Sequence, residues 1–128
     1  MTKPLFLGVD CLALPVANLE AALAFYRDHL GHQLVWRTKD SAGLRIGDGP
    51  AELVLRQTDQ PPETDLLVES AEKAARRFVE AGGKILAGPF DIKIGKCVVV
   101  ADPWGNRLVL LDTTKGLLRT DANGNVIE

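Results

Sequence analysis

The sequence has few cysteines, few aromatic residues and little net charge, and each shortage excludes a class of protein. Two cysteines, Cys11 and Cys97, cannot build a disulfide scaffold or a zinc knuckle in 128 residues, and we expect both to be buried thiols. Aromatic residues make up 5% of the chain, which argues against a surface that stacks on bases. A formal net charge of −2 gives no sign of a positively charged binding surface. We therefore expect neither nucleic acid nor an anionic membrane as a partner.

Long apolar runs are also missing. None approaches the roughly 20 residues that a membrane helix requires, and residues 1–10 show neither a long apolar stretch nor a small-residue cleavage site, so no signal peptide is predicted. These features favour a cytoplasmic protein. The length of 128 residues and an apolar content of 46% are typical of one globular domain, spanning residues 1–128, that buries its own core.

A strand, a helix and a glycine follow one another near the start of the chain. Residues 9–15 are apolar apart from Asp10, and Asn18 is a suitable N-cap for the helix that follows. Apolar residues then recur at helical spacing until Gly31, which predicts the end of the helix. The stripe consists of Leu19, Ala22, Leu23, Tyr26 and Leu30. Strands are predicted next at 33–38, 44–46 and 52–56, with turns at 39–43 and 47–50.

After a polar linker at 57–62, the second half of the chain repeats this order. Four positions match at a constant separation of 52 residues: Asn18 with Ser70, Glu20 with Glu72, Ala22 with Ala74, and Tyr26 with Phe78. Because helix cap and apolar stripe repeat together, the pattern indicates an internal duplication. Further strands are predicted at 65–68, 84–86, 97–101 and 107–111, with a loop at 88–93 and a turn at 102–106. The tail, 113–128, lies outside the repeat, and its Asn123-Gly124 turn predicts a small hairpin or an arm on a neighbouring subunit.

This order of elements predicts an α+β fold with two βαβββ modules, at about 5–58 and 63–112. One helix covers only one face of a sheet. The two modules are therefore expected to form a curved mixed sheet around a cleft, closed either within one chain or across two chains.

Two short motifs carry a resemblance to a known family. The first is Phe25-Tyr26 with Leu30-Gly31, and the second is Asp102-Pro103 with Gly105-Asn106. Together with the paired modules, residues from about 5 to 112 resemble the vicinal oxygen chelate superfamily, which includes glyoxalase I, extradiol dioxygenases and bleomycin resistance proteins.

The resemblance implies a set of metal-ligand positions. In the metal-dependent members these would correspond to Cys11, Val54, Glu63 and Val109, with Asp65 beside Glu63 on the same strand. Valine cannot bind a metal, and two donors are too few for a divalent ion. We therefore expect no metal and no cofactor. His29 and His32 flank Gly31 at the helix end, where we expect contact with solvent.

Strand alternation predicts which side chains line the cleft. The leucines and valine at 12, 14, 53, 55, 66, 68, 108 and 110 are expected under the helices. The expected ligand-binding residues lie on the opposite face and at its margin: Cys11, Trp36, Val54, Arg56, Glu63, Asp65, Trp104, Arg107 and Val109. The arginines either pair weakly in solvent or anchor an anionic group of the ligand. Trp104 either caps the core or forms a wall, and Trp36 suits the core or a dimer contact.

Three functions are consistent with these residues. The first is metal-independent binding of a small hydrophobic or amphipathic molecule in the cleft of a homodimer, as in bleomycin resistance proteins. The second is a glyoxalase-like lyase or dioxygenase that holds a divalent metal through atypical ligands. The third is a scaffold whose cleft is filled by side chains. Glu63 or Asp65 could act as an acid or base, but no catalytic residue is assigned.

Overall fold

The computed structural model describes residues 3–127 and has an α+β fold with two compact units. The N-terminal module comprises Asp10–Glu63 together with the tail from Leu118 onward. The C-terminal module comprises Thr64–Leu117 together with the described part of Met1–Val9. Each module is described below by itself.

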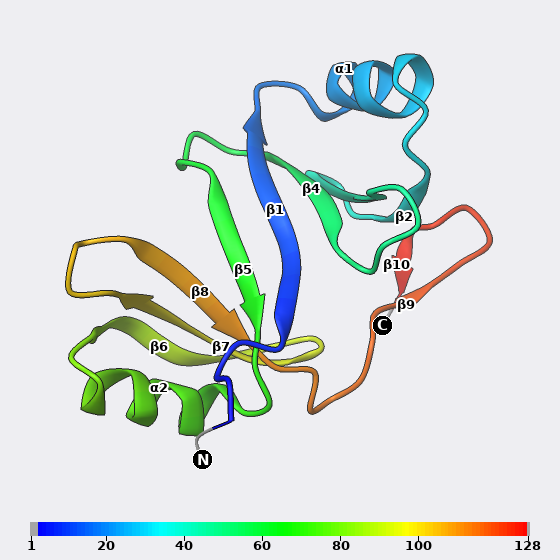
Figure 1. Cartoon of the computed structure of the whole chain (residues 1–128). Helices are drawn as coiled ribbons and strands as arrows, with labels where there is room; N and C mark the ends of the chain where they lie inside the picture. The colour runs from blue at the N-terminus through cyan, green and yellow to red at the C-terminus, as the bar shows by residue number, and fades with distance from the viewer. Residues whose placement is uncertain (1–2, 128) are drawn as a thin grey trace. The chain divides into compact units, whose positions relative to one another are not determined.

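Both modules contain one strand, one helical segment and three further strands, which confirms the two βαβββ units (Figure 1). The first runs β1 (Gly8–Val16), α1 (Leu19–Leu23), the π-helix η1 (Ala24–His29), β2 (Leu34–Arg37), β3 (Ser41–Arg45) and β4 (Glu52–Gln57). The second runs β5 (Glu63–Leu67), α2 (Ala71–Glu80), β6 (Lys84–Ile92), β7 (Gly95–Ala101) and β8 (Arg107–Leu111).

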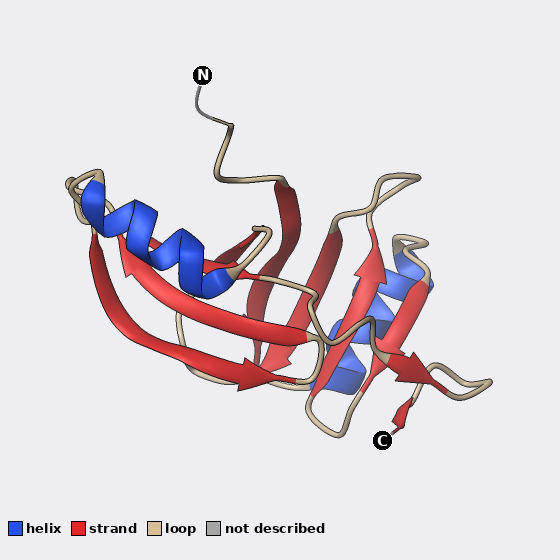
Figure 2. Cartoon of the chain, turned by 90° about the horizontal axis from the view of Figure 1, so that it is seen from below, coloured by secondary structure: helices blue, strands red, loops and turns tan. Residues whose placement is uncertain are grey.

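The two modules use the same strand order. The N-terminal module has the order β2-β3-β4-β1, and the C-terminal module has the order β6-β7-β8-β5. In each, the first and last strands pair in parallel and the other pairs are antiparallel. One helix packs on one face of the strands of its own module, as Figure 2 shows for α2.

The start of each helix is capped twice. The predicted caps are confirmed, because the Asn18 side chain accepts from the Ala21 amide at 2.8 Å and Ser70 accepts from the Lys73 amide at 3.3 Å. A second cap comes from the end of the last strand of the module. Gln57 Oε1 accepts from the Leu19 amide at 2.9 Å, and Asp112 Oδ2 accepts from the Ala71 amide at 2.7 Å. The two modules therefore share a second helix cap, and in both the capping residue lies outside the helix in the sequence.

The alternation of apolar residues places the cores as predicted, with one exception. The core at α1 consists of Leu19, Leu23, Ala42, Leu44 and Leu55, and Leu14 and Leu53 pack against it. The core at α2 consists of Val68, Ala71, Ala74, Ala75, Val98, Val100 and Leu110, and Leu66 and Leu108 pack against it. Leu12 was expected under a helix, but it is 43% exposed.

Two predicted loops are strands instead. Ser41–Gly43 was predicted as part of a turn, but it pairs with β4, and Ala42 is fully buried. Ser41, Ala42 and Gly43 are small residues without alternation of apolar and polar side chains, so this part of β3 is recognised only by its pairing with β4. The predicted loop at 88–93 lies mostly within β6, which stays paired with β7 through two register shifts on either side of Ala87. Such register shifts allow β6 to continue through Gly88 and Pro89.

The end of the first helix also differs in detail from the prediction. Its last six residues form a π-helix, and the Leu30 amide donates to the Phe25 carbonyl at 3.0 Å. Gly31 follows with φ of +83°, a conformation that suits glycine, so the predicted stop is correct.

The tail forms the predicted terminal hairpin, with β9 (Arg119–Thr120) antiparallel to β10 (Val126–Ile127). Within residues 3–127, no helix is both long enough and apolar enough to cross a membrane.

Asp112 is a buried carboxylate that joins three segments of the C-terminal module through hydrogen bonds. Besides the Ala71 amide, it accepts from the Lys96 amide at 3.0 Å and from the Thr114 hydroxyl at 2.8 Å. Burial raises the pKa of Asp112, but these hydrogen bonds outweigh burial and leave the pKa below its ordinary value of 3.8.

We expect Asp112→Ala to lower the free energy of unfolding by about 2–4 kcal/mol, because several buried donors lose their acceptor. The native contribution is present above the unfolded pKa and is lost as the pH falls through the lowered folded pKa. Urea denaturation at pH 7 and pH 3 measures both effects. Asp48→Ala, at the exposed turn between β3 and β4, is the control and should have a much smaller effect. Equal losses for the two variants would contradict the assignment.

Candidate functional site

The face of the N-terminal module that points away from α1 carries a small apolar floor. Cys11 and Ala13 of β1 and Val54 of β4 are buried together there, and Trp36 of β2 packs against them. Strand register explains the grouping, because Ala13 lies opposite Val54 and Cys11 lies opposite Glu52. The structure thus brings together three of the predicted site residues, Cys11, Trp36 and Val54.

The Trp36 ring is fixed at two points. Trp36 lies opposite Gly43 in β3, and a Cβ atom at residue 43 would collide with the indole. The indole therefore lies directly over the backbone at a position where only glycine leaves room. Its Nε1 donates a hydrogen bond to Glu52 Oε1 at 2.7 Å. Together these contacts hold the ring in one orientation over the sheet.

Two partly buried carboxyl groups border this floor. Burial raises the pKa of Glu52, the hydrogen bond from Trp36 lowers it, and the nearby Asp10 carboxylate raises it further. Burial also raises the pKa of Asp10, against the effect of a hydrogen bond with Cys11. Both carboxyl groups therefore hold their protons more tightly than exposed ones.

Sequence reasoning missed the role of these two acids. The hydrogen bond between Glu52 and Trp36 spans 16 residues, so no local pattern in the sequence indicates it. Asp10 does have a signal, because it is the one charged residue in the apolar run at 9–15.

The metal-ligand positions implied by the family resemblance do not form a ligand set. Val54 is 3% exposed and Val109 is 5% exposed, so two of the four positions are apolar and buried. Glu63 forms an ion pair with Arg56 at 3.2 Å. These four residues do not fit a divalent ion.

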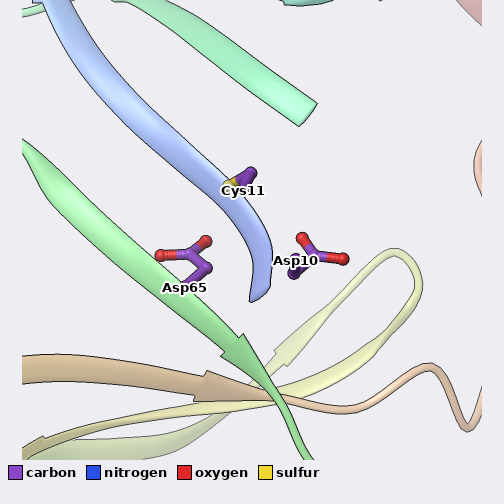
Figure 3. A group of neighbouring side chains, drawn as sticks. All are labelled: Asp10, Cys11 and Asp65. Atoms are coloured by element: carbon purple, nitrogen blue, oxygen red, sulfur yellow. The ribbon is translucent and has the colours of Figure 1, made fainter. Parts of the chain in front are cut away.

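Cys11, one of these four residues, and the carboxyl groups of Asp10 and Asp65 are of types that bind metals. Asp10 and Cys11 are adjacent on β1 in the N-terminal module, and Asp65 is a buried residue of β5 in the C-terminal module (Figure 3). Each of the three offers one ligand atom, a carboxylate oxygen or a thiol sulfur. Of the three, Asp10 is absent from the positions that the resemblance implies.

The remaining predicted residues have different surroundings. Arg56 is half-exposed in its pair with Glu63, a geometry in which an ion pair contributes little stability. In the C-terminal module, Asp65 lies opposite Val109 in the parallel pair of β5 and β8. Arg107 is exposed at the start of β8. Trp104 does not cap the core, because it is 84% exposed in the turn before that strand, and it is not among the residues that pack against the floor of Cys11, Ala13 and Val54.

Comparisons with known proteins agree with this architecture. Residues 8–110 match the model of the Glyoxalase/Bleomycin resistance protein/Dioxygenase superfamily. A comparison with curated proteins finds no match.

Among solved structures, methylmalonyl-CoA epimerase from Mycobacterium tuberculosis is similar at a TM-score of 0.75 and 19% identity, over 89% of this chain and 93% of the epimerase. A hypothetical protein from Bacillus halodurans C-125 is similar at a TM-score of 0.71 and 15% identity, over 87% of this chain and 97% of the other. Homoprotocatechuate 2,3-dioxygenase from Brevibacterium fuscum is similar at a TM-score of 0.66 and 21% identity, and the match covers 98% of this chain but 39% of the dioxygenase. At these identities the likeness shows a common fold.

The raised pKa of Glu52 predicts a pH dependence of stability. Because the folded pKa lies above the ordinary 4.5, the contribution of this group is fully present below that pH and is lost as the pH rises through the folded pKa. Glu52→Gln keeps an oxygen acceptor for Trp36 but does not titrate. We expect its free energy of unfolding, measured in urea from pH 4 to pH 8, to fall less with rising pH than that of the native protein.

Glu80→Gln, on the exposed side of α2, is the matched control and should leave the native slope unchanged. Parallel curves for Glu52→Gln and the native protein would show that Glu52 is not responsible.

Proposed function

The chain belongs to the Glyoxalase/Bleomycin resistance protein/Dioxygenase superfamily, and on that basis we propose that it binds a small hydrophobic or amphipathic organic molecule without a metal. In this respect it would act like a bleomycin resistance protein. The observation that carries the proposal is the Trp36 indole, held in one orientation beside the buried floor of Cys11, Ala13 and Val54. We further propose that it acts as a homodimer in the cytoplasm, where its two thiols would stay reduced.

An apolar surface with a few polar groups suits such a ligand. Small-molecule sites are mostly apolar, and a small number of placed polar groups orient the bound molecule. Here the floor and the indole would contact the apolar body of the ligand. Glu52 and Asp10 border the floor and would interact with its polar groups.

A divalent metal is the second candidate, in a glyoxalase-like lyase or a dioxygenase. It is favoured by the donor atoms of Asp10 and Cys11, which are adjacent on β1 in the N-terminal module. A bound divalent ion would supply Lewis-acid polarisation of a substrate oxygen. The chain's own contribution would be to hold Cys11 and Asp10 as ligands, and each would release its proton as the metal binds.

Ligand binding can be tested with 1-anilinonaphthalene-8-sulfonate, a small amphipathic dye. The chain has two tryptophans, so Trp104→Phe leaves Trp36 as the one tryptophan reporter. We expect the dye to quench Trp36 emission and to raise the melting temperature, because it binds the folded state. Methylmalonyl-CoA is a second probe, since an epimerase of this substrate shares the fold.

Trp36→Ala should weaken dye binding by about tenfold, which corresponds to roughly 1.4 kcal/mol. Trp104→Ala is the matched control and should bind as the native protein does. Circular dichroism verifies that both variants fold. Equal dye affinity for the two variants, or a dye that lowers the melting temperature, would contradict the proposed site.

Metal analysis separates the two candidates. For the metal-independent function we expect purified protein without stoichiometric Mn, Fe, Ni or Zn and a melting temperature that EDTA leaves unchanged. Stoichiometric metal that is lost in Cys11→Ser and Asp10→Asn would establish the second candidate instead. The effect of Asp65→Asn would then show whether the C-terminal module supplies a ligand.

A further inference from the structure

Trp36 lies on a strand that is weakly held by its own sheet. β2 has four residues and is the outermost strand of the N-terminal module. It pairs with β3 through Leu34, Trp36 and Arg37, and the register shifts between Leu34 and Trp36. A short edge strand with irregular pairing opens more easily than a central strand. Contacts on the outer side of β2 therefore stabilise the strand that carries Trp36.

The tail supplies that support. The hairpin of residues 118–127, here called the C-terminal strap, lies beside β2 (Figure 1). The Arg37 amide donates to the Gly124 carbonyl at 2.7 Å, and Arg37 forms a parallel bridge with Asn125. Gly124 also lies close to Leu34, because a Cβ atom at Gly124 would be 3.4 Å from Leu34 Cδ2. The strap thus contacts β2 on both sides of Trp36 along the strand.

The tip of the strap, residues 121–125, is a turn that side-chain hydrogen bonds hold together. Asp121 Oδ1 accepts from the Asn123 amide at 2.8 Å and from the Asn125 amide at 3.0 Å, and Asn125 Nδ2 donates to Asp121 Oδ2 at 3.1 Å. Gly124 has φ of +84°, a backbone conformation that favours glycine. The carbonyl of Gly124 is therefore presented to β2 in a fixed position.

Arg37, the residue after Trp36, joins the strap to the helix. Its guanidinium donates to Glu20 of α1 at 2.6 Å, while its amide is bound by Gly124. We propose that the C-terminal strap positions Trp36 for ligand binding and that Gly124 is the positioning residue. This inference rests on the proposed function for its consequence in binding, although its effect on Trp36 does not require a ligand.

Releasing the strap leaves Trp36 held by β3 and by its hydrogen bond to Glu52. The fraction of molecules with the indole in the binding orientation then falls, and the apparent affinity falls by the same fraction. The strap therefore affects the site through β2.

The chain offers a matched control for testing this. Residues 102–106 form a second turn of the same D-x-x-G-N sequence, in which Asp102 Oδ1 accepts from the Trp104 amide at 2.9 Å and from the Asn106 amide at 2.8 Å. Its Gly105 has φ of +88°, and a Cβ atom there would meet nothing within 4 Å. Gly124→Val and Gly105→Val thus strain the same type of turn, in different modules.

Both substitutions, and a chain that ends at Leu117 and so lacks the strap, are made in the Trp104→Phe protein. Trypsin cleavage after Arg119 reports release of the strap. We expect Gly124→Val and the shortened chain to shift ligand-free Trp36 emission to longer wavelength and to weaken dye binding about fivefold or more, whereas Gly105→Val changes dye affinity by less than about twofold.

Unchanged Trp36 emission in the folded, shortened chain would overturn the inference, as would an equal shift in Gly105→Val. The shortened chain always lacks the strap, so the test holds even if Gly124→Val is not cleaved. If the unsubstituted protein fails to bind the dye while the emission shifts as expected, the proposed function fails and the strap's effect on Trp36 stands.

Discussion

The structure depends on the parallel pairing between the first and last strands of each module. Parallel neighbours need a long connection, and here the helix and two strands supply it. The side chain that caps the helix is the last residue of the last strand in one module, Gln57 for α1, and the residue directly after it in the other, Asp112 for α2. This contact fixes the start of each helix over one face of its strands, and the opposite face of the N-terminal module carries the floor of the proposed site.

Buried carboxyl groups have opposite roles in the two modules because their neighbours differ. Asp112 is surrounded by backbone amides and a hydroxyl, which stabilise the ionised form and lower its pKa. Glu52 has one indole donor and lies near another carboxylate, so burial dominates and its pKa rises. The first arrangement stabilises the fold. The second places acids with raised pKa values at the edge of an apolar floor, as many binding sites do.

The proposed site is assembled from segments that are distant in the sequence. β1 and β4 supply the floor, β2 supplies the indole, and Gly43 of β3 leaves room for that indole. The tail is part of the same module, although it follows the entire C-terminal module in the chain. A terminal segment outside the repeat is thereby connected to the one aromatic side chain of the floor.

Local patterns in the sequence determined the duplication, the caps at Asn18 and Ser70, and the alternation that sends Leu53 and Leu55 to the core and Val54 to the other face. The resemblance to the family implied metal-ligand positions at Val54 and Val109, and valine carries no donor atom for a metal. Tertiary structure alone decided that Ser41–Gly43 is a strand, that Trp36 lies over Gly43, that Asp10 and Glu52 have raised pKa values, and that the tail holds β2. The reason is physical. Helix caps and periodic patterns involve residues a few positions apart, whereas the hydrogen bond from the Ala71 amide to the Asp112 carboxylate spans 41 residues. Burial and pairing at such separations exist only once the strands have found their register.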